Sequence, residues 1–334
     1  MDDHIQDVQP AGTAEESSSL TWTPEYNGYT LSIAAVENDS IPELKKSLAL
    51  ARKFFHESDT DYVQFREEVF HIVLSHHSIT LLTYMLDHEG VPVSLVTPNS
   101  ISQWASRPLI EALIARGWDV NRQDGGASKG NRLIDYFVRE RYGKGDLVRW
   151  LVEEKGAAVE IQQSDTDGDN RRTRPPPLLE TCAALGSVPM FKFLEGKGAR
   201  FSRRILHEAV EIAADIGANP DCEVPAQDPG EKAKNMRVEM LHYLVDERHL
   251  DINGMDADEI PQDDATDSYR GTPICYAARC RKGAPVVRWL LKKGADPTSR
   301  SPDGRFDAIA YAKEGKCDEV LSVLEEWKRT KVQS

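Results

Sequence analysis

Residues 271–303 read GTPICYAARCRKGAPVVRWLLKKGADPTSRSPD. Thr272 and Pro273 suit a helix start, because threonine can cap exposed amide groups and proline lacks only an N–H that has no helical partner there. A second helix follows, and its apolar residues recur at spacings of three and four: Val286, Val287, Leu290 and Leu291. Gly294 then predicts the end of that helix. The stretch therefore predicts a short helix, a turn, a longer helix and a loop.

The same pattern returns once more before the end of the chain. Four residues of the first copy, Gly271, Ala277, Leu290 and Leu291, have counterparts at one constant offset in Gly304, Ala310, Val323 and Leu324. A fixed period of this length indicates a stacked array of helix pairs. The T-P-x-x-x-A-A start and the W-L-L-x-x-G-A-D finish resemble an ankyrin repeat. The chain departs from the family's T-P-L-H start, since Cys275 stands at the histidine position and the histidine occurs only as His207.

Weaker copies of this pattern can be followed from residue 29 to residue 330. The resemblance implies an all-α fold, an ankyrin-type solenoid of about eight helix-turn-helix units with short projecting loops. We expect a disordered acidic tail at residues 1–24, the array at residues 25–330 and a short C-terminal tail at residues 331–334. Within the array we expect three polar insertions, at about residues 162–177, 218–235 and 253–270.

The net charge of −14 is concentrated in two segments. Residues 1–25 hold six acids and residues 251–267 hold seven, and neither contains a lysine or arginine. The remaining chain is nearly neutral, which argues against direct DNA or RNA binding. The acidic start predicts no secretory signal, and the lack of an apolar run of about 18 residues predicts no membrane span. The five scattered cysteines predict reduced thiols, and together these features predict a protein of the cytoplasm or nucleus.

Tests for metal or phosphate chemistry fail on spacing. Asp165, Asp167 and Asp169 alternate as in a calcium loop, but Asn170 and Pro176 stand where glycine and glutamate are required, so a solvated charged loop is favoured. The glycines of residues 125–130 lack the phosphate-loop spacing and fit a connection between units.

Zinc motifs fail on the number of ligands. His207 and Glu208 open a zinc-hydrolase pattern, but Glu211 replaces the second histidine, so a structural histidine is the better interpretation. Cys275 and Cys280 have no second pair and suit buried helix positions. We therefore expect no metal, no cofactor and no catalytic residue.

The resemblance implies that a concave face of short helices and loop tips binds a protein. The leading hypothesis is a monomeric, non-catalytic scaffold or adaptor with an unidentified protein partner. Candidate contact residues, chosen by position, are Trp118, Arg122, Asp124, Tyr276, Arg279, Arg300 and Arg305. Trp118 stands where the family commonly has alanine, and it is either a packing residue or a binding hot spot.

Two further classes stay open. One is a nuclear transcription coregulator of the fungal ankyrin-only type, in which Leu20, Trp22 and Tyr26 would belong to an activation segment. The arginines at 171, 172 and 174 could then act in nuclear import, although a solvated cluster that balances nearby acids is favoured. The other class is an enzyme with an unrecognised site.

Overall fold

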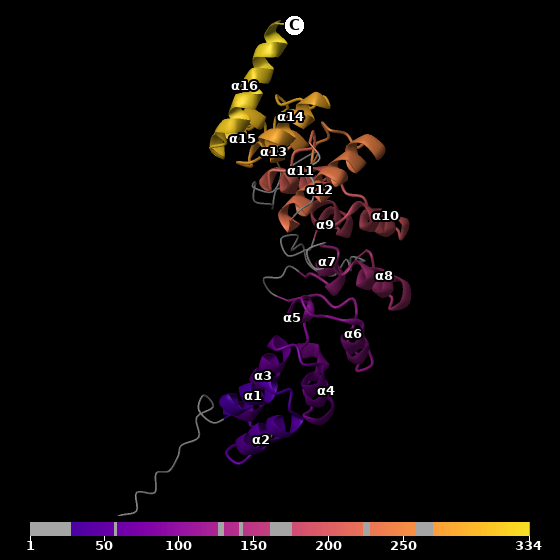
Figure 1. Ribbon diagram of the computed structural model, residues 1–334, viewed down its shortest axis with the longest axis vertical. Coiled ribbons are helices and arrows are strands. Elements are labelled where there is room, and N and C mark those ends of the chain that lie inside the picture. Colours follow the sequence, from indigo (N-terminus) through magenta and orange to yellow (C-terminus); the bar gives the residue numbers. More distant parts are fainter. Residues whose placement is uncertain are drawn as a thin grey trace, which may run out of the picture. The chain divides into compact units, whose positions relative to one another are not determined.

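The computed structural model describes residues 28–56, 59–125, 130–139, 143–160, 176–222, 228–257 and 270–333 (Figure 1). These residues form sixteen α-helices and no strand, which confirms the all-α prediction. The chain divides into two compact units, Met1–Pro92 and Val93–Ser334, called here the N-terminal and C-terminal units. The predicted tail of residues 1–24, the calcium-like loop, the arginine cluster and most of the glycine-rich connection lie outside the described residues.

The N-terminal unit contains two helix pairs, which are α1 (Tyr29–Glu37) with α2 (Ile41–Ala51) and α3 (Thr60–Ser75) with α4 (Ile79–His88). Helix α1 packs against α2 and α3, and α4 packs against the same two helices. The second helix of each pair begins at a serine whose hydroxyl accepts a backbone N–H three residues on, at Ser40 and Ser78. Such caps satisfy amide groups that have no partner within the helix.

The C-terminal unit continues the pairing through six more helix pairs. In chain order they are α5 (Pro98–Ile101) and α6 (Arg107–Ile114), α7 (Leu133–Phe137) and α8 (Gly145–Glu154), α9 (Leu178–Leu185) and α10 (Val188–Gly196), α11 (Ile205–Asp215) and α12 (Pro229–His242), α13 (Pro273–Ala278) and α14 (Ala284–Lys292), α15 (Ala308–Glu314) and α16 (Asp318–Gln333). A π-helical turn, η6 (Tyr243–Glu247), extends α12. We call the two members of each pair its first and second helix.

Neighbouring pairs share their apolar surfaces. The first helix α11 packs against α9 and α13, and α13 packs in turn against α15. Ala277 and Ala278 of α13 are fully buried, so two backbones can approach closely there. Leu290 on the second helix is also fully buried, and Gly294 takes a φ of +95° after its end. The helix-turn-helix-loop unit predicted for residues 271–303 is therefore present.

The structure corrects the constant offset predicted between the last two units. When the two units are aligned by which residues are buried, Tyr276 and Ala277 of the first helix match Tyr311 and Ala312. Leu290 of the second helix matches Leu324, so the first and second helices have different offsets. Both offsets are longer than predicted, because Ser301 and Phe306 form a short hairpin in the last loop, with hydrogen bonds of 2.6 and 3.0 Å between them. The correspondence of Ala277 with Ala310 was therefore wrong, and Ala310 is only half-buried.

Three local expectations also change. Thr272 occupies the N-cap of α13, but its hydroxyl caps no amide and instead lies 3.6 Å from the Cys275 sulfur. Helix α12 begins at Pro229, so the end of the expected insertion 218–235 is helical; the Asp228 carboxylate caps it by accepting the Glu231 N–H at 2.8 Å. Helix α16 runs to Gln333, so residues 331–333 of the expected tail are helical as well.

Candidate partner-binding surface

In the C-terminal unit the loops that follow the second helices share one backbone design. Each begins at a residue with positive φ, namely Gly117, Gly156, Gly198, His249 or Gly294. In three of these loops an aspartate accepts the N–H of the residue two positions on at 2.9 Å: Asp119 from Asn121, Asp251 from Asn253, and Asp296 from Thr298. This local bond fixes the loop turn without a partner elsewhere in the chain. His249 shows that the left-handed position is kept even where glycine is absent.

Two asparagines link successive loops. The Asn121 side chain donates to the Gly156 carbonyl at 3.1 Å and accepts the Ala158 N–H at 2.7 Å. The Asn253 side chain makes the equivalent contacts with the Gly294 carbonyl at 3.1 Å and the Asp296 N–H at 2.8 Å. Each asparagine thus closes the junction between one helix pair and the next with two hydrogen bonds.

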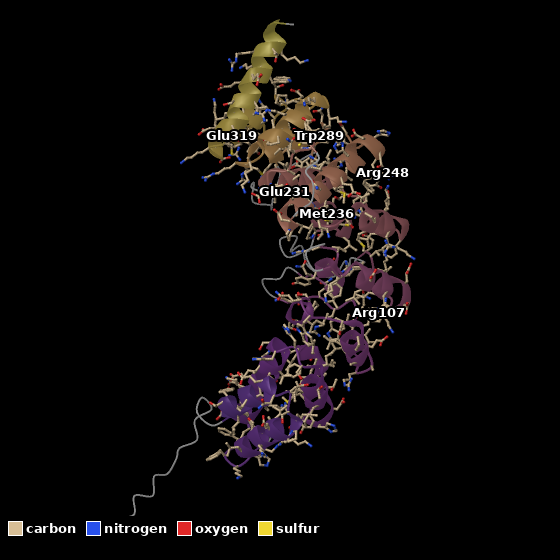
Figure 2. All side chains as sticks on the ribbon, viewed as in Figure 1. Arg107, Glu231, Met236, Arg248, Trp289 and Glu319 are labelled. Carbon is tan, nitrogen blue, oxygen red and sulfur yellow. The ribbon has the colours of Figure 1, made fainter. Side chains whose placement is uncertain are left out.

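The ends of the second helices carry a matching series of ion pairs. A cation at the end of one helix meets a carboxylate of the preceding second helix in Lys155–Glu111, Lys197–Glu153, Arg248–Glu195 and Lys293–Asp246. Each of these cations also lies 5.0 to 5.7 Å from the ring centroid of Trp150, Phe193, Phe201 or Trp289 respectively. Arg107, Arg248 and Trp289, labelled in Figure 2, come from α6, the end of η6 and α14. The cations and acids of these four ion pairs therefore connect successive helix pairs.

The two candidate residues Trp118 and Arg122 lie in the loop after α6. Trp118 is 3% exposed, and its indole N–H donates to the Val96 carbonyl at 2.8 Å. This position agrees with the packing interpretation of Trp118. Arg122 is half-buried and donates to the Ser94 carbonyl at 2.6 Å, so part of its guanidinium is also engaged within the fold.

Asp124 and Tyr276 belong to buried aspartate–tyrosine pairs. The Asp124 carboxylate accepts the Tyr136 hydroxyl at 2.7 Å and the Asn99 N–H at 3.0 Å. The Tyr276 hydroxyl donates to Asp256 at 2.7 Å, and burial raises the pKa of Tyr276. Both candidates are buried in this structure, so their side chains support the loops rather than face solvent.

The remaining candidates are exposed arginines. Arg279 ends α13, whereas Arg300 and Arg305 lie in the last loop, where Arg300 donates to the Gly304 carbonyl at 3.2 Å and Arg305 pairs with Asp303. Burial alone would raise the pKa of Asp303, but hydrogen bonds from Ser301 and Arg305 lower it to about 2. These three positions can reach a partner without any rearrangement of the fold.

The first helices carry buried polar groups. A ring nitrogen of His207 lies 3.0 Å from the Gly254 carbonyl oxygen, and burial lowers the pKa of His207, so it stays neutral as a structural histidine. Its ring meets the Tyr276 ring edge-on at 5.2 Å between centroids. Glu180 accepts the Ser202 hydroxyl, and burial raises its pKa although Ser202 and Arg204 act in the opposite direction.

The structure also reveals a charged hollow that sequence reasoning missed. It has a volume of about 510 Å³ and is lined by Glu211, Asp215, Arg270, Arg279, Cys280, Arg281 and Lys282. Burial raises the pKa of the Cys280 thiol to about 12, so this cysteine is not a reactive thiolate. Of the lining residues only Arg279 was a candidate. The run Arg279-Cys280-Arg281-Lys282, three cations in four residues, was the available signal.

Metal ligands do not gather within the described part of the chain, where no group of three or more His, Cys, Asp or Glu side chains could hold a metal ion. Cys275 is buried at the start of α13, and burial raises its pKa to about 11, which agrees with the expected buried helix position. Cys280 is only half-buried and follows the end of α13, so the same expectation was wrong for this residue. Among the described helices, none is long and apolar enough to cross a membrane.

The fold and the junctions define a protein of consecutive packed helix pairs. Comparison with protein families shows an ankyrin repeat at residues 271–302, which covers α13, α14 and the loop after them. This module is usually non-catalytic and in general mediates protein–protein interaction, but it accounts for 32 of the 334 residues. The match gives no information on the fungal regulatory type. No curated protein matches the chain.

Proposed function

We propose that the chain is a non-catalytic scaffold or adaptor whose helix pairs form an ankyrin-type array that binds a protein partner. The observation that carries the proposal is the recurrence of one junction. Asn121 makes the same two backbone contacts as Asn253, although Asn121 lies several helix pairs before the matched repeat, which begins at Gly271. A shared junction supports shared stacking of the intervening pairs.

Stacked pairs leave some loop and turn side chains with no role in the fold. The exposed Arg279 occupies such a position, and Arg300 makes only a local hydrogen bond to the Gly304 carbonyl within its own loop. The junction cations Lys155, Lys197 and Lys293 each pair with an acid of the neighbouring helix pair, so they are poor candidates for partner contacts. The Arg305–Asp303 ion pair differs because it lies within one loop and joins no helix pairs. We therefore propose that the partner binds at the turns and loops, with Arg279, Arg300 and Arg305 among its contacts.

Affinity capture with mass spectrometry tests this function. We expect wild type to enrich a defined protein relative to a tag-only control, and the charge-reversed variant Arg300→Glu/Arg305→Glu to lose part of that enrichment. Lys328→Glu/Arg329→Glu on α16 makes the same change in net charge at exposed positions and should retain the partner. A capture profile identical to that of the tag alone would contradict the scaffold proposal.

The coregulator alternative rests on Leu20, Trp22 and Tyr26 and on the arginines at 171, 172 and 174, all outside the described residues. No observation in the structure favours it over a scaffold in another compartment. Its test is a separate one: nuclear imaging of a tagged copy, together with a reporter assay of the tail.

A further inference from the structure

Three neighbouring cations in the C-terminal unit lie outside the ion pairs that hold its junctions. Arg279, Arg281 and Lys282 are exposed, and none forms an ion pair with a described carboxylate. Elsewhere in this unit the cations at the ends of α8, α10, η6 and α14 each meet an acid of the neighbouring pair. The chain has a net charge of −14, so three neighbouring cations without a described acidic partner are unusual in it. The ion pairs between helix pairs do not explain why these cations are present.

The backbone that carries these cations is fixed. The Arg279 carbonyl accepts the Cys317 thiol at 3.4 Å, and the Cys280 thiol lies 3.5 Å from the Tyr276 carbonyl. A Cβ atom added to Gly217 would lie 3.1 Å from the Lys282 Cβ, so the base of the Lys282 side chain packs closely on the turn after α11. A ligand that meets these cations would therefore not have to order the backbone first.

The hollow beside this turn has two unlike walls. Arg279, Arg281 and Lys282 form one wall, and Glu211 and Asp215 come from the last two turns of α11. Arg270, which also lines the hollow, is already engaged, since it pairs with Glu211 at 2.6 Å and lies 5.1 Å from the Tyr276 ring centroid. The lining thus offers three cations that no described acid neutralises, together with carboxylate oxygens that can accept hydrogen bonds.

We infer that this hollow binds an acidic segment of a protein partner, a conclusion that rests on the proposed scaffold function. Carboxylate side chains of the segment would pair with Arg279, Arg281 and Lys282, and its backbone N–H groups would donate to Asp215. A DNA or polyphosphate backbone carries acceptors but no such donors, so it would leave the Asp215 carboxylate without a hydrogen-bond partner. An acidic peptide matches both walls.

Fluorescence anisotropy with the full chain tests the inference. The probe is a short fluorescein-labelled peptide of alternating glutamate and glycine, compared with the same peptide carrying glutamine in place of glutamate. We expect only the glutamate peptide to bind, and its binding to weaken as NaCl is raised, because the Debye length falls from about 10 Å at 0.1 M to about 3 Å at 1 M.

Charge reversal then locates the site. For Arg279→Glu/Arg281→Glu we expect the dissociation constant to rise about tenfold or more, because two attractions become repulsions. Arg288→Glu/Lys328→Glu changes the net charge equally at exposed positions on α14 and α16 and should leave affinity within about twofold. Circular dichroism of both variants checks the fold. Equal losses in the two variants, or no binding of the glutamate peptide, would overturn the inference.

Two further experiments can contradict this inference without contradicting the scaffold function. A single-stranded oligothymidine of the same charge should compete poorly; if it binds more tightly than the peptide, the site recognises phosphates and the inference fails. A phage library of random peptides panned on the full chain should enrich acidic sequences that Arg279→Glu/Arg281→Glu no longer retains. Enrichment of neutral sequences that bind both variants would overturn the acidic-segment inference and leave the scaffold function standing.

Discussion

The N-terminal and C-terminal units join their helix pairs by different polar contacts. In the N-terminal unit a buried carboxylate, Glu89, accepts from Arg52 at the end of α2 and from the Tyr84 hydroxyl, each at 2.5 Å, and burial raises the pKa of Tyr84 to about 12. In the C-terminal unit the neutral side chains of Asn121 and Asn253 bridge loop to loop, and exposed ion pairs repeat along the second helices. The asparagine contacts and the ion pairs recur at equivalent positions along the C-terminal unit.

This difference explains why the C-terminal unit can be predicted from the sequence more readily than the N-terminal unit. A recurring junction needs the same short pattern at each copy, as in Asp119-Val120-Asn121 and Asp251-Ile252-Asn253. A contact made once, such as Arg52 with Glu89 across 37 residues, leaves no pattern to find. Substitutions can show whether burial or recurrence decides how much a polar contact stabilises the chain.

The largest effect is expected from Arg132→Met. Arg132 and Asp135 are both 3% exposed, and the arginine also reaches the Ala158 carbonyl at 2.5 Å. Removing the cation would leave a buried carboxylate, at a cost of about 3–5 kcal/mol in urea unfolding. Arg204→Met is the matched control, because Arg204 precedes α11 in the same position but pairs with Glu208 nearer the surface. Equal costs for the two variants would show that burial of the pair is not the cause.

A smaller loss is expected from Gly283→Ala, in the turn between α13 and α14. A Cβ there would lie 2.2 Å from the Ala277 carbonyl oxygen, so the turn must shift, at about 1–3 kcal/mol. The turns of the N-terminal unit instead use Asp39 and His77, at φ values of 47° and 63°. Gly196→Ala, where nothing lies within 4 Å, should not destabilise the protein. A thermal melt in which both alanines behave alike would refute the close-approach explanation.

The asparagine junctions should each be worth less. We expect Asn121→Ala and Asn253→Ala to cost about 1–2 kcal/mol apiece, since each removes two hydrogen bonds of about 1 kcal/mol net. The two losses should add in the double variant, because the junctions share no residue. Denaturant unfolding checks both values. Losses that differ severalfold between the two sites would mean that the junctions are alike only in geometry.

The smallest effect concerns a buried carboxylate with a hydroxyl donor. Burial raises the pKa of Glu180 above its ordinary 4.5, so the unfolded chain loses this proton first and the free energy of unfolding falls as the pH rises above 4.5. Glu180→Gln removes that fall and should raise the melting temperature at pH 7 more than at pH 4. Glu239→Gln, at an exposed position, should change neither. A larger gain at pH 4 would reverse the assigned sign.

Local features of the fold could be predicted from the sequence, and long-range ones could not. The apolar spacing of Val286 to Leu291 predicted α14, and Gly294 predicted its end. The bond between Asp256 and Tyr276 could not be predicted, because 20 residues separate the two. The repeat offset was misjudged for a similar reason, since the hairpin at Ser301 and Phe306 depends on backbone pairing rather than on an apolar pattern.

The candidate site divides in the same way. Exposed positions such as Arg279 and Arg300 follow from their place in the repeat, and both are exposed in the structure. Trp118, Asp124 and Tyr276 were chosen by the same rule but are buried, because their hydrogen-bond partners come from other loops or helices. Partner binding by any of the seven candidates stays a prediction.

Native-state hydrogen exchange on Asn253→Ala distinguishes an array held together junction by junction from a single cooperative body. If each helix pair depends on its neighbours, protection should fall in α12, α13 and α14 and stay near the wild-type level in α6 and α8. A uniform loss of protection from α1 to α16 would show that the described chain unfolds all at once, and would contradict the array.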